Sequence, residues 1–287
     1  MTDLERNRLV LRTNLLRASG VTRVAPYLTA GDGGLDRTLE LLGAVERAGA
    51  ACVELGVPFT DPIADGPILQ AAAARALSHG TTLDGIEDTV RAYRARGGEV
   101  PIVAFSYLNP LMSGGAPGAL AARFASLADA GFDGVLVPDL PIEEAPAIVA
   151  LAEQSGLAAV LFCAPTTSDE RLARAAEATR GFLYVVGRTG VTGASTSMSN
   201  DATDYLARAR RIAGDVPIGV GFGIRSAEQV TAVAEHAELA IVGSALVAAI
   251  HEAATAADGD STEAAVRCAT EFMESLLPTS NRALPRP

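Results

Sequence analysis

The sequence contains no lysine, so all 23 of its basic side chains are arginines. Aldolases that work through a Schiff base need a lysine amine, and that mechanism is therefore excluded. Cysteine and histidine are also scarce, with three residues of each and no CxxC pair. This pattern favours buried thiols and surface imidazoles over metal ligands, so we expect no metal site among Cys52, Cys163, Cys268, His79, His236 and His251.

Positive charge and long apolar runs are missing as well. The formal net charge is -11 at pH 7, which argues against a basic surface for nucleic acid or anionic membranes. No window approaches the roughly 18 consecutive apolar residues of a spanning helix. The N-terminal sequence MTDLERNRLVLR begins with charged residues and lacks the apolar core of a signal peptide. We therefore expect a cytoplasmic protein with no nucleic-acid or membrane partner.

What the chain has is a repeating pattern of short apolar runs. Several are nearly continuous in Val, Ile, Leu and Ala, as in parallel strands that are covered on both faces. Stretches with helical spacing separate them, and many of these end in glycine, the usual helix stop. The apolar runs span residues 24–29, 51–56, 101–107, 133–139, 157–164, 181–187, 217–223 and 238–244.

Strand followed by helix, eight times over, most simply closes into an α/β fold of the (β/α)8 TIM-barrel type. A doubly wound open sheet is the alternative. Helical spacing at residues 3–18 predicts an extra N-terminal helix before the first strand. The length of 287 residues and the 49% hydrophobic content suit a single domain over 1–287, with a flexible tail from about residue 278.

Active sites of this fold lie where the strands end, which directs attention to the segment ELGVPFTDPIADGP after the second run. Glu54 interrupts an apolar strand, and Asp61 and Asp65 stand on the loop that follows. Burial would raise the pKa of Glu54 toward a value useful for acid catalysis. Spacing alone agrees equally well with a purely structural interpretation, in which the glutamate pairs with an arginine and the aspartates make turns before proline.

The seventh and eighth runs end in glycine-bearing turns, GFGIRSAEQ and GSALVAAI, that lead into helices. Ser226 with Gln229 forms a predicted capping box, and Ser244 is the next predicted N-cap. Glycines at a helix start let a phosphate approach backbone N–H groups, and this fold often binds phosphate after strands 7 and 8. The motif predicts a phosphorylated ligand, although ordinary turn glycines would look the same.

After the sixth run, residues 187–200 read GRTGVTGASTSMSN, a stretch rich in Gly, Ser and Thr. It is too long and too polar for a tight turn between a strand and a helix. A lid that closes over the site and a plain connector both agree with this composition.

These segments resemble the tryptophan synthase alpha chain family, in the same order and with the same spacing along nearly the whole barrel. The string ELGVPFTDPIADGP is the most specific match. The matching stretches are PYLTAGD (26–32), ELGVPFTDPIADGP (54–67), YLNP (107–110), VPDLPIEE (137–144), APTTSDERL (164–172), TGVTGA (189–194), GFGI (221–224) and VGSALV (242–247).

The resemblance implies a lyase that splits indole-3-glycerol phosphate into indole and glyceraldehyde 3-phosphate. It implies no cofactor in this chain, since pyridoxal phosphate belongs to a beta subunit that partners the alpha chain. By motif match, Glu54 is the general acid and base, and Asp65 holds the indole N–H. Thr192 matches a lid threonine that engages this aspartate.

Motif matching also assigns the rest of the expected site. The phosphate cradle corresponds to Gly193, Gly221, Gly223, Gly243 and Ser244. The indole pocket corresponds to Tyr184, Phe222, Phe105 and Leu136, although ordinary barrel core explains most of these apolar side chains equally well. The face toward the beta subunit corresponds to Asp61, Pro62, Asn109 and Pro110. Departures from the family pattern include GDGG at 31–34 and the residues after Pro110. The residues after Pro110 bear on that interface, and the catalytic pair is unchanged.

Three rival functions follow from the same residues. A stand-alone lyase would keep the chemistry and release free indole to a specialised pathway. A catalytically silent barrel would serve only as an allosteric partner, against which the retention of Glu54, Asp65 and Thr192 argues. Another phosphosugar aldolase or epimerase would need a lysine or clustered histidines, and the chain has neither.

Overall fold

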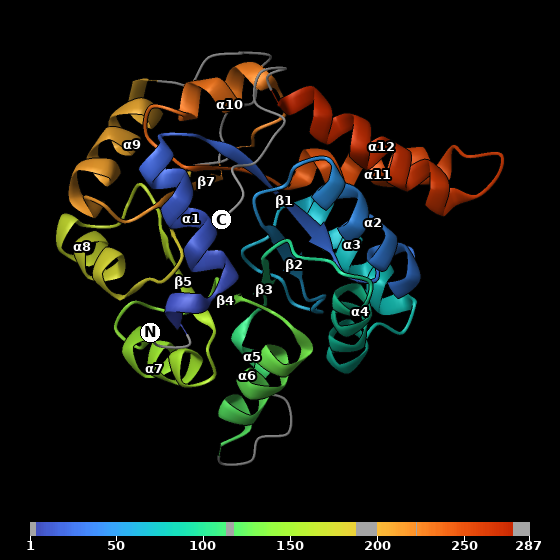
Figure 1. Cartoon of the computed structure of the whole chain (residues 1–287), viewed down its shortest axis with the longest axis horizontal. Coiled ribbons are helices and arrows are strands. Elements are labelled where there is room, and N and C mark those ends of the chain that lie inside the picture. The colour runs from blue at the N-terminus through green and yellow to red at the C-terminus, as the bar shows by residue number, and fades with distance from the viewer. Residues whose placement is uncertain (1–3, 113–117, 188–199, 222, 278–287) are drawn as a thin grey trace.

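The structure is a computed structural model that describes residues 4–112, 118–187, 200–221 and 223–277. Eight parallel strands pair in sequence order, and the last pairs with the first to close a barrel ringed by helices (Figure 1). This confirms the predicted (β/α)8 barrel and rules out the open sheet. The strands are β1 Arg23–Thr29, β2 Val53–Gly56, β3 Ile102–Phe105, β4 Gly134–Leu136, β5 Ala158–Cys163, β6 Leu183–Val186, β7 Ile218–Gly221 and β8 Leu239–Val242.

Helices follow the strands, with additional ones before β1 and at the C-terminal end. No helix in the described ranges is long and apolar enough to cross a membrane. In sequence order they are η1 Leu4–Arg6, α1 Arg8–Ser19, α2 Leu35–Arg47, α3 Pro67–Ser78, α4 Leu83–Ala95, α5 Leu108–Leu111, α6 Ala119–Ala130, α7 Ala145–Gln154, α8 Asp169–Ala178, α9 Asn200–Ala213, α10 Ala227–Val233, α11 Ser244–Thr255 and α12 Ser261–Leu276.

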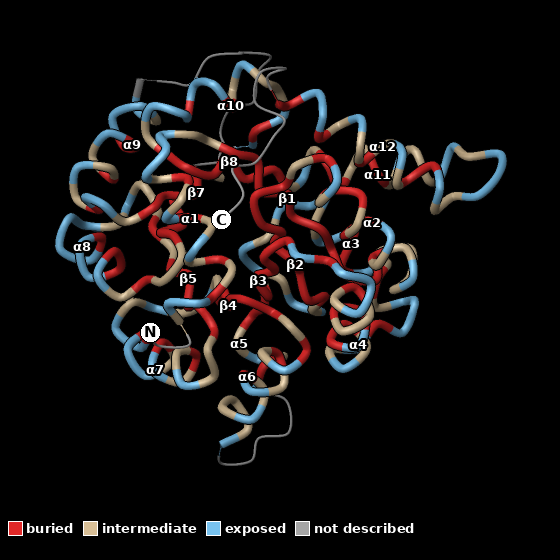
Figure 2. Tube along the Cα trace, in the orientation of Figure 1, coloured by how far each residue is buried: buried red, intermediate tan, exposed pale blue. Residues whose placement is uncertain are grey.

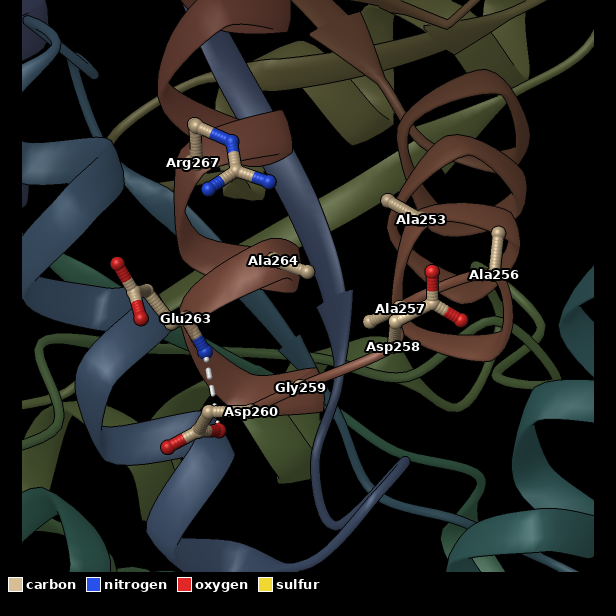
Figure 3. A pocket seen from close by; sticks show the side chains of 9 residues that line it. All are labelled: Ala253, Ala256, Ala257, Asp258, Gly259, Asp260, Glu263, Ala264 and Arg267. Carbon is tan, nitrogen blue, oxygen red and sulfur yellow. Dashed lines mark hydrogen bonds between the residues drawn. The ribbon is translucent and has the colours of Figure 1, made fainter.

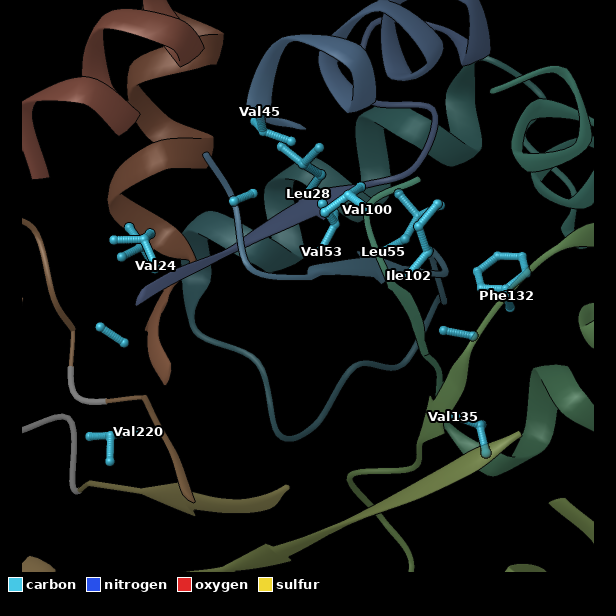
Figure 4. Close-up of a cluster of buried hydrophobic side chains, with 14 of the residues drawn as sticks. Val24, Leu28, Val45, Val53, Leu55, Val100, Ile102, Phe132, Val135 and Val220 are labelled. Carbon is cyan, nitrogen blue, oxygen red and sulfur yellow. The ribbon is translucent and has the colours of Figure 1, made fainter. Parts of the chain in front are cut away.

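Alternation along each strand divides the core into an outer and an inner layer. Val53, Leu55 and Ile102 belong to the large cluster between strands and helices, part of which Figure 4 shows. Val103 and Leu136 belong to a second cluster inside the barrel. The strands are therefore buried on both faces, whereas the helices expose their outer sides (Figure 2). Glu54 lies between Val53 and Leu55 and so points inward.

The extra N-terminal helix closes the end of the barrel at which the strands begin. Leu9 of α1 is fully buried against inward-facing strand residues. A Cβ atom at Gly134 or Gly181 would lie about 3 Å from its side chain, so these two glycines make room for it. The Asn7 amide donates hydrogen bonds to the Asp133 and Gly156 carbonyl oxygens at 2.7 and 2.9 Å. With this end sealed, the opposite, carboxyl end of the strands is left to form the site.

Three local expectations need correction. The helix expected over 3–18 is divided at Asn7, whose extended backbone and side chain start α1 anew. Ser244 is not the N-cap of α11 but its first residue, because the first helical hydrogen bond, from the Val247 N–H, returns to Gly243. Ser226 does cap α10, yet the Gln229 side chain accepts from Arg225 N–H rather than completing the box at Ser226.

Candidate active site

Glu54 is a buried carboxyl group with no hydrogen-bonding partner among the described residues. Its residue is 1% exposed, and neither carboxyl oxygen meets a donor among the described residues. Burial raises the pKa of Glu54 well above its ordinary value, because the charged form loses its hydration. The alternative that it pairs with an arginine is thus excluded for the described part of the chain. A carboxyl held in this way keeps its proton and can act as a general acid.

Asp65 is the second carboxyl of the site and lies on the loop between β2 and α3. Burial raises its pKa to about 6, and a hydrogen bond from the Tyr107 hydroxyl opposes this shift. Burial and the charges of both carboxyls also raise the pKa of Tyr27 and of Tyr184. Glu54 and Asp65 therefore lie around the same two phenols, in environments that give them different affinities for a proton.

Tyr107 holds the loop that carries Asp65. Its hydroxyl accepts a hydrogen bond from the Ala64 N–H at 2.9 Å. Its ring lies 5.5 Å from the ring of Phe59, at the start of the same loop. The loop between β2 and α3 is thus fixed at two points on either side of Asp61 and Pro62.

Four aromatic rings from four strands line the inside of the barrel near its carboxyl end. Tyr27 of β1 meets Phe105 of β3 edge to face at 5.4 Å. Phe105 meets Phe162 of β5 in the same manner at 6.1 Å, and Phe162 stacks on Tyr184 of β6 at 4.4 Å. Leu136 of β4, between Phe105 and Val160 in register, is fully buried in the inner cluster. Such a wall suits a flat aromatic ligand.

The expected phosphate cradle is described in part. A Cβ atom at Gly221 would lie 2.7 Å from the Tyr184 hydroxyl, so this position must remain a glycine while Tyr184 keeps its place. Gly223 has a φ of +67°, a conformation that favours glycine. Gly243 precedes α11, so the backbone N–H groups at its start point to the carboxyl end of the barrel. Thr192, Gly193 and Phe222 lie outside the described residues.

The residues expected to face a partner lie on the loop between β2 and α3 and on the short helix α5, at this end of the barrel. Asp61 and Asn109 are exposed, and Pro62 and Pro110 are half-buried. Three exposed apolar side chains stand on or beside the same segments: Ile63 at 85%, Ile68 at 40% and Met112 at 46%. We call these three residues the apolar rim.

The sequence interpretation missed three residues that the geometry brings into the site: Tyr27, Tyr107 and Phe162. Tyr27 is paired with Glu54 in the register of β1 and β2, and its hydroxyl packs directly over Gly56. Phe162 completes the stack on Tyr184. All three belong to apolar runs or motifs, where an aromatic residue is expected in the hydrophobic core. Only the alternation of inward and outward side chains along a strand could have indicated that they face the site.

Two further features lie apart from this site. A surface cavity of about 390 Å3 is lined by Ala253, Asp258 and Arg267, among others, between α11 and α12 (Figure 3). One of its carboxylates, Asp260, caps α12 by accepting from two backbone N–H groups. In the described residues, no group of three or more His, Cys, Asp or Glu is placed to hold a metal ion.

Comparisons with known proteins agree on one family. The family model described as tryptophan synthase alpha chain matches residues 14–276. The tryptophan synthase alpha chain of Alkalilimnicola ehrlichii is 46% identical over 241 residues, 84% of this chain and 86% of the relative. That of Synechococcus sp. strain CC9902 is 43% identical over 249 residues, 86% and 90% of the two chains.

Solved structures give the same result. A structure of the tryptophan synthase alpha subunit from Pyrococcus furiosus, at 35% identity, superposes with a TM-score of 0.78. A chain from the structure of the α2β2 complex of tryptophan synthase from the same organism, at 36% identity, gives 0.80. Each comparison covers 88% of this chain and 97% of the other.

Proposed function

This chain belongs to the tryptophan synthase alpha chain family, whose members cleave indole-3-glycerol phosphate in a lyase reaction, and we propose that Glu54 and Asp65 carry out this cleavage. Alpha chains need no cofactor, since pyridoxal phosphate belongs to the beta subunit. The observation that carries the assignment is the burial of Glu54 inside the barrel with neither carboxyl oxygen hydrogen-bonded among the described residues.

Glu54 acts first as the acid. With its pKa raised by burial, its carboxyl donates a proton to C3 of the indole ring. The resulting carboxylate then removes the proton from the glycerol hydroxyl next to the bond that breaks. The electron pair of the carbon–carbon bond returns to the ring, which leaves as indole, and the glycerol carbon becomes the aldehyde of glyceraldehyde 3-phosphate.

Asp65 stabilises the charge that this sequence creates. Protonation at C3 places positive charge on the ring, and a carboxylate that accepts the indole N–H attracts it. With a pKa of about 6, Asp65 is mostly ionised at pH 7, as this role requires. The two carboxyls can hold different protonation states because Glu54 is fully buried and Asp65 is only partly so.

The substrate would lie across the carboxyl end of the barrel. Its indole ring would contact Tyr27, Phe105, Leu136, Phe162 and Tyr184, next to Glu54. Its phosphate would meet the N–H groups around Gly223, Gly243 and Ser244, where a helix start favours anions. On the motif match alone, Thr192 is proposed for the lid, Gly193 for the phosphate cradle and Phe222 for the indole pocket.

We further propose a tryptophan synthase beta subunit as the partner, in an α2β2 assembly like that of the Pyrococcus furiosus complex. It would bind at Asp61, Pro62, Asn109 and Pro110. The apolar rim supports this face, because three of the four large apolar side chains that are exposed in the described residues stand on or beside these two segments.

Two coarser proposals concern the whole chain. The eight units share a single closed barrel, which supports one domain over residues 1–287. The biosynthetic role of the family supports a cytoplasmic enzyme.

The test is indole production from indole-3-glycerol phosphate by purified Glu54→Gln and Asp65→Asn. Loss of a general acid or base costs about 100-fold to 10,000-fold, so both variants should lose most of their kcat. Substrate affinity, measured by calorimetry, should change far less. Asp129→Asn, on the exposed side of α6, is the matched control. Turnover within tenfold of the parent enzyme by either variant would remove that residue from the mechanism.

A further inference from the structure

Helix α5 starts without a side-chain cap from the residue at its N-cap position. Tyr107 occupies that position and makes no side-chain cap bond. Its side chain instead reaches across to the loop between β2 and α3. The first N–H group of the helix, that of Leu108, would then lack a partner, as helix starts generally do without a cap.

Asp139 supplies that partner from the neighbouring strand end. Its Oδ1 atom accepts the Leu108 N–H at 3.0 Å. Strands β3 and β4 pair Phe105 with Leu136, and this register places residues that are 31 positions apart side by side. Leu108 and Asp139 keep the same separation, so the cap continues the register past the ends of both strands. The contact is built into the barrel rather than being an accident of loop conformation.

The other end of this connection is the catalytic loop. The Tyr107 hydroxyl accepts a hydrogen bond from the Ala64 N–H, next to Asp65 in the chain, and its interaction with the Asp65 carboxyl lowers the pKa of that group. The Tyr107 carbonyl is held in turn by the Ser106 hydroxyl at 3.0 Å. Any shift of the backbone at residues 107 and 108 would therefore move the hydroxyl that binds the loop at Ala64, beside Asp65.

We propose that Asp139 is a positioning residue for the lyase reaction: by capping α5 at Leu108, it sets Tyr107 and, through Tyr107, the catalytic carboxylate of Asp65. This inference rests on the proposed function of Asp65. Asp139 itself is exposed and hydrogen-bonds to the Leu108 N–H rather than to Glu54 or Asp65, and, after burial, its charge also contributes to raising the pKa of Tyr107.

The experiment compares Asp139→Ala with Asp139→Asn in the full chain, measuring kcat, KM and the pH dependence of kcat. Loss of a helix cap corresponds to roughly fivefold to tenfold, and we expect kcat of the Ala variant to fall by about that factor with little change in KM. The Asn side chain keeps an oxygen acceptor and should restore kcat to within about twofold. Rescue by Asn would show that the hydrogen bond matters rather than the charge.

The pH profile separates positioning from a general loss of stability. The hydrogen bond from Tyr107 lowers the pKa of Asp65, so a misplaced Tyr107 should move the acid limb of kcat, near pH 6, to higher pH. Two further tyrosines whose pKa Asp65 influences, Tyr27 of β1 and Tyr184 of β6, stay neutral in this range because burial raises their pKa. Asp129→Ala on α6 is the control and should leave the limb in place.

A double-mutant cycle completes the test. If Asp139 acts through Tyr107, adding Asp139→Ala to Tyr107→Phe should cost less than about twofold more. An unchanged acid limb in Asp139→Ala, full additivity with Tyr107→Phe, or no rescue by Asn would overturn the proposal. Activity in Asp65→Asn would instead overturn the role of Asp65, and the inference with it, so the two failures are distinguishable.

Discussion

Two buried carboxylates show how differently the fold treats acidic side chains. Asp133 is 3% exposed and receives Arg8 at 2.7 Å, Arg94 at 2.9 Å and the Ile102 N–H at 2.8 Å. Glu54 is buried as deeply and receives none of these among the described residues. Burying a carboxyl group without a partner costs free energy of folding. Asp133 is paired and stabilises the fold, whereas Glu54, unpaired among the described residues, is available for the reaction.

The cost of burying Glu54 leads to a prediction about stability. Its folded pKa is raised, so the native state holds this proton more tightly than the unfolded chain does. Stability from this group is therefore greatest below about pH 4.5 and falls as pH rises toward the folded pKa. Glu54→Gln removes this loss, and its Tm should exceed that of the parent enzyme by an amount that grows from pH 4.5 to pH 7. Calorimetry measures the difference, and a Tm gap independent of pH would contradict the expected titration.

At the residue scale, the sequence predicts the catalytic carboxyls but not the groups that surround them. Glu54 can be identified because a charged residue in an apolar strand is chemically out of place. Tyr27 and Phe162 cannot, because aromatic residues in strands are ordinary core. Their roles depend on the register, which turns them inward beside Glu54 and Tyr184.

Among the elements, α1 shows how a single side chain can both start a helix and attach it to the barrel. Asn7 caps it through Oδ1, which accepts from Leu9 and Val10, while its amide donates to two carbonyl oxygens just before β4 and β5. One side chain thus joins the helix to the strands that it covers. Asn7 therefore stabilises the end of the barrel at which the strands begin, whereas the site lies at the opposite, carboxyl end.

Asn7→Ala should therefore destabilise the protein without affecting chemistry. Loss of the cap and of two hydrogen bonds amounts to about 3 kcal/mol. For a chain of this size we expect Tm to fall by roughly 6 to 12 °C. Asn7→Asp keeps the capping oxygen but not the amide donors and should fall between the two proteins. Thermal unfolding followed by circular dichroism provides the measurement. An Asn7→Ala variant as stable as the parent would show that the hydrogen bonds of Asn7 do not stabilise the protein.

Element boundaries could be predicted where a local signal exists. Helix α4, Leu83–Ala95, has such signals at both ends, since Thr82 caps its start and a glycine follows soon after its end. The short helix α5 escaped prediction because four residues are too few to show helical spacing. The run 133–139 exceeds β4, which spans Gly134–Leu136, because apolar character reports burial and not strand pairing.

At the scale of the whole molecule, closure of the barrel explains why distant segments form one site. Strands β1, β3, β5 and β6 contribute the aromatic wall, and the loops after β2 and β3 contribute Asp65 and Tyr107. The same closure places the catalytic loop beside the exposed segment that contains Asn109 and Pro110. We expect contact with a partner on that segment to affect the position of Tyr107, which is two residues from Asn109 in the chain.

The apolar rim provides the test of that partnership. We expect the double variant Ile63→Ser, Met112→Ser to weaken binding of a tryptophan synthase beta subunit by at least about tenfold, since exposed apolar anchors at an interface each contribute about 1 kcal/mol or more. Leu11→Ser is the matched control, because Leu11 is 42% exposed but lies on α1, at the closed end of the barrel. Titration of the beta subunit, with indole release as the signal, gives the apparent Kd and the stimulation of each variant over its own baseline. If Leu11→Ser weakens binding as much as the double variant does, or if the double variant binds like the parent, the beta subunit does not dock on this face.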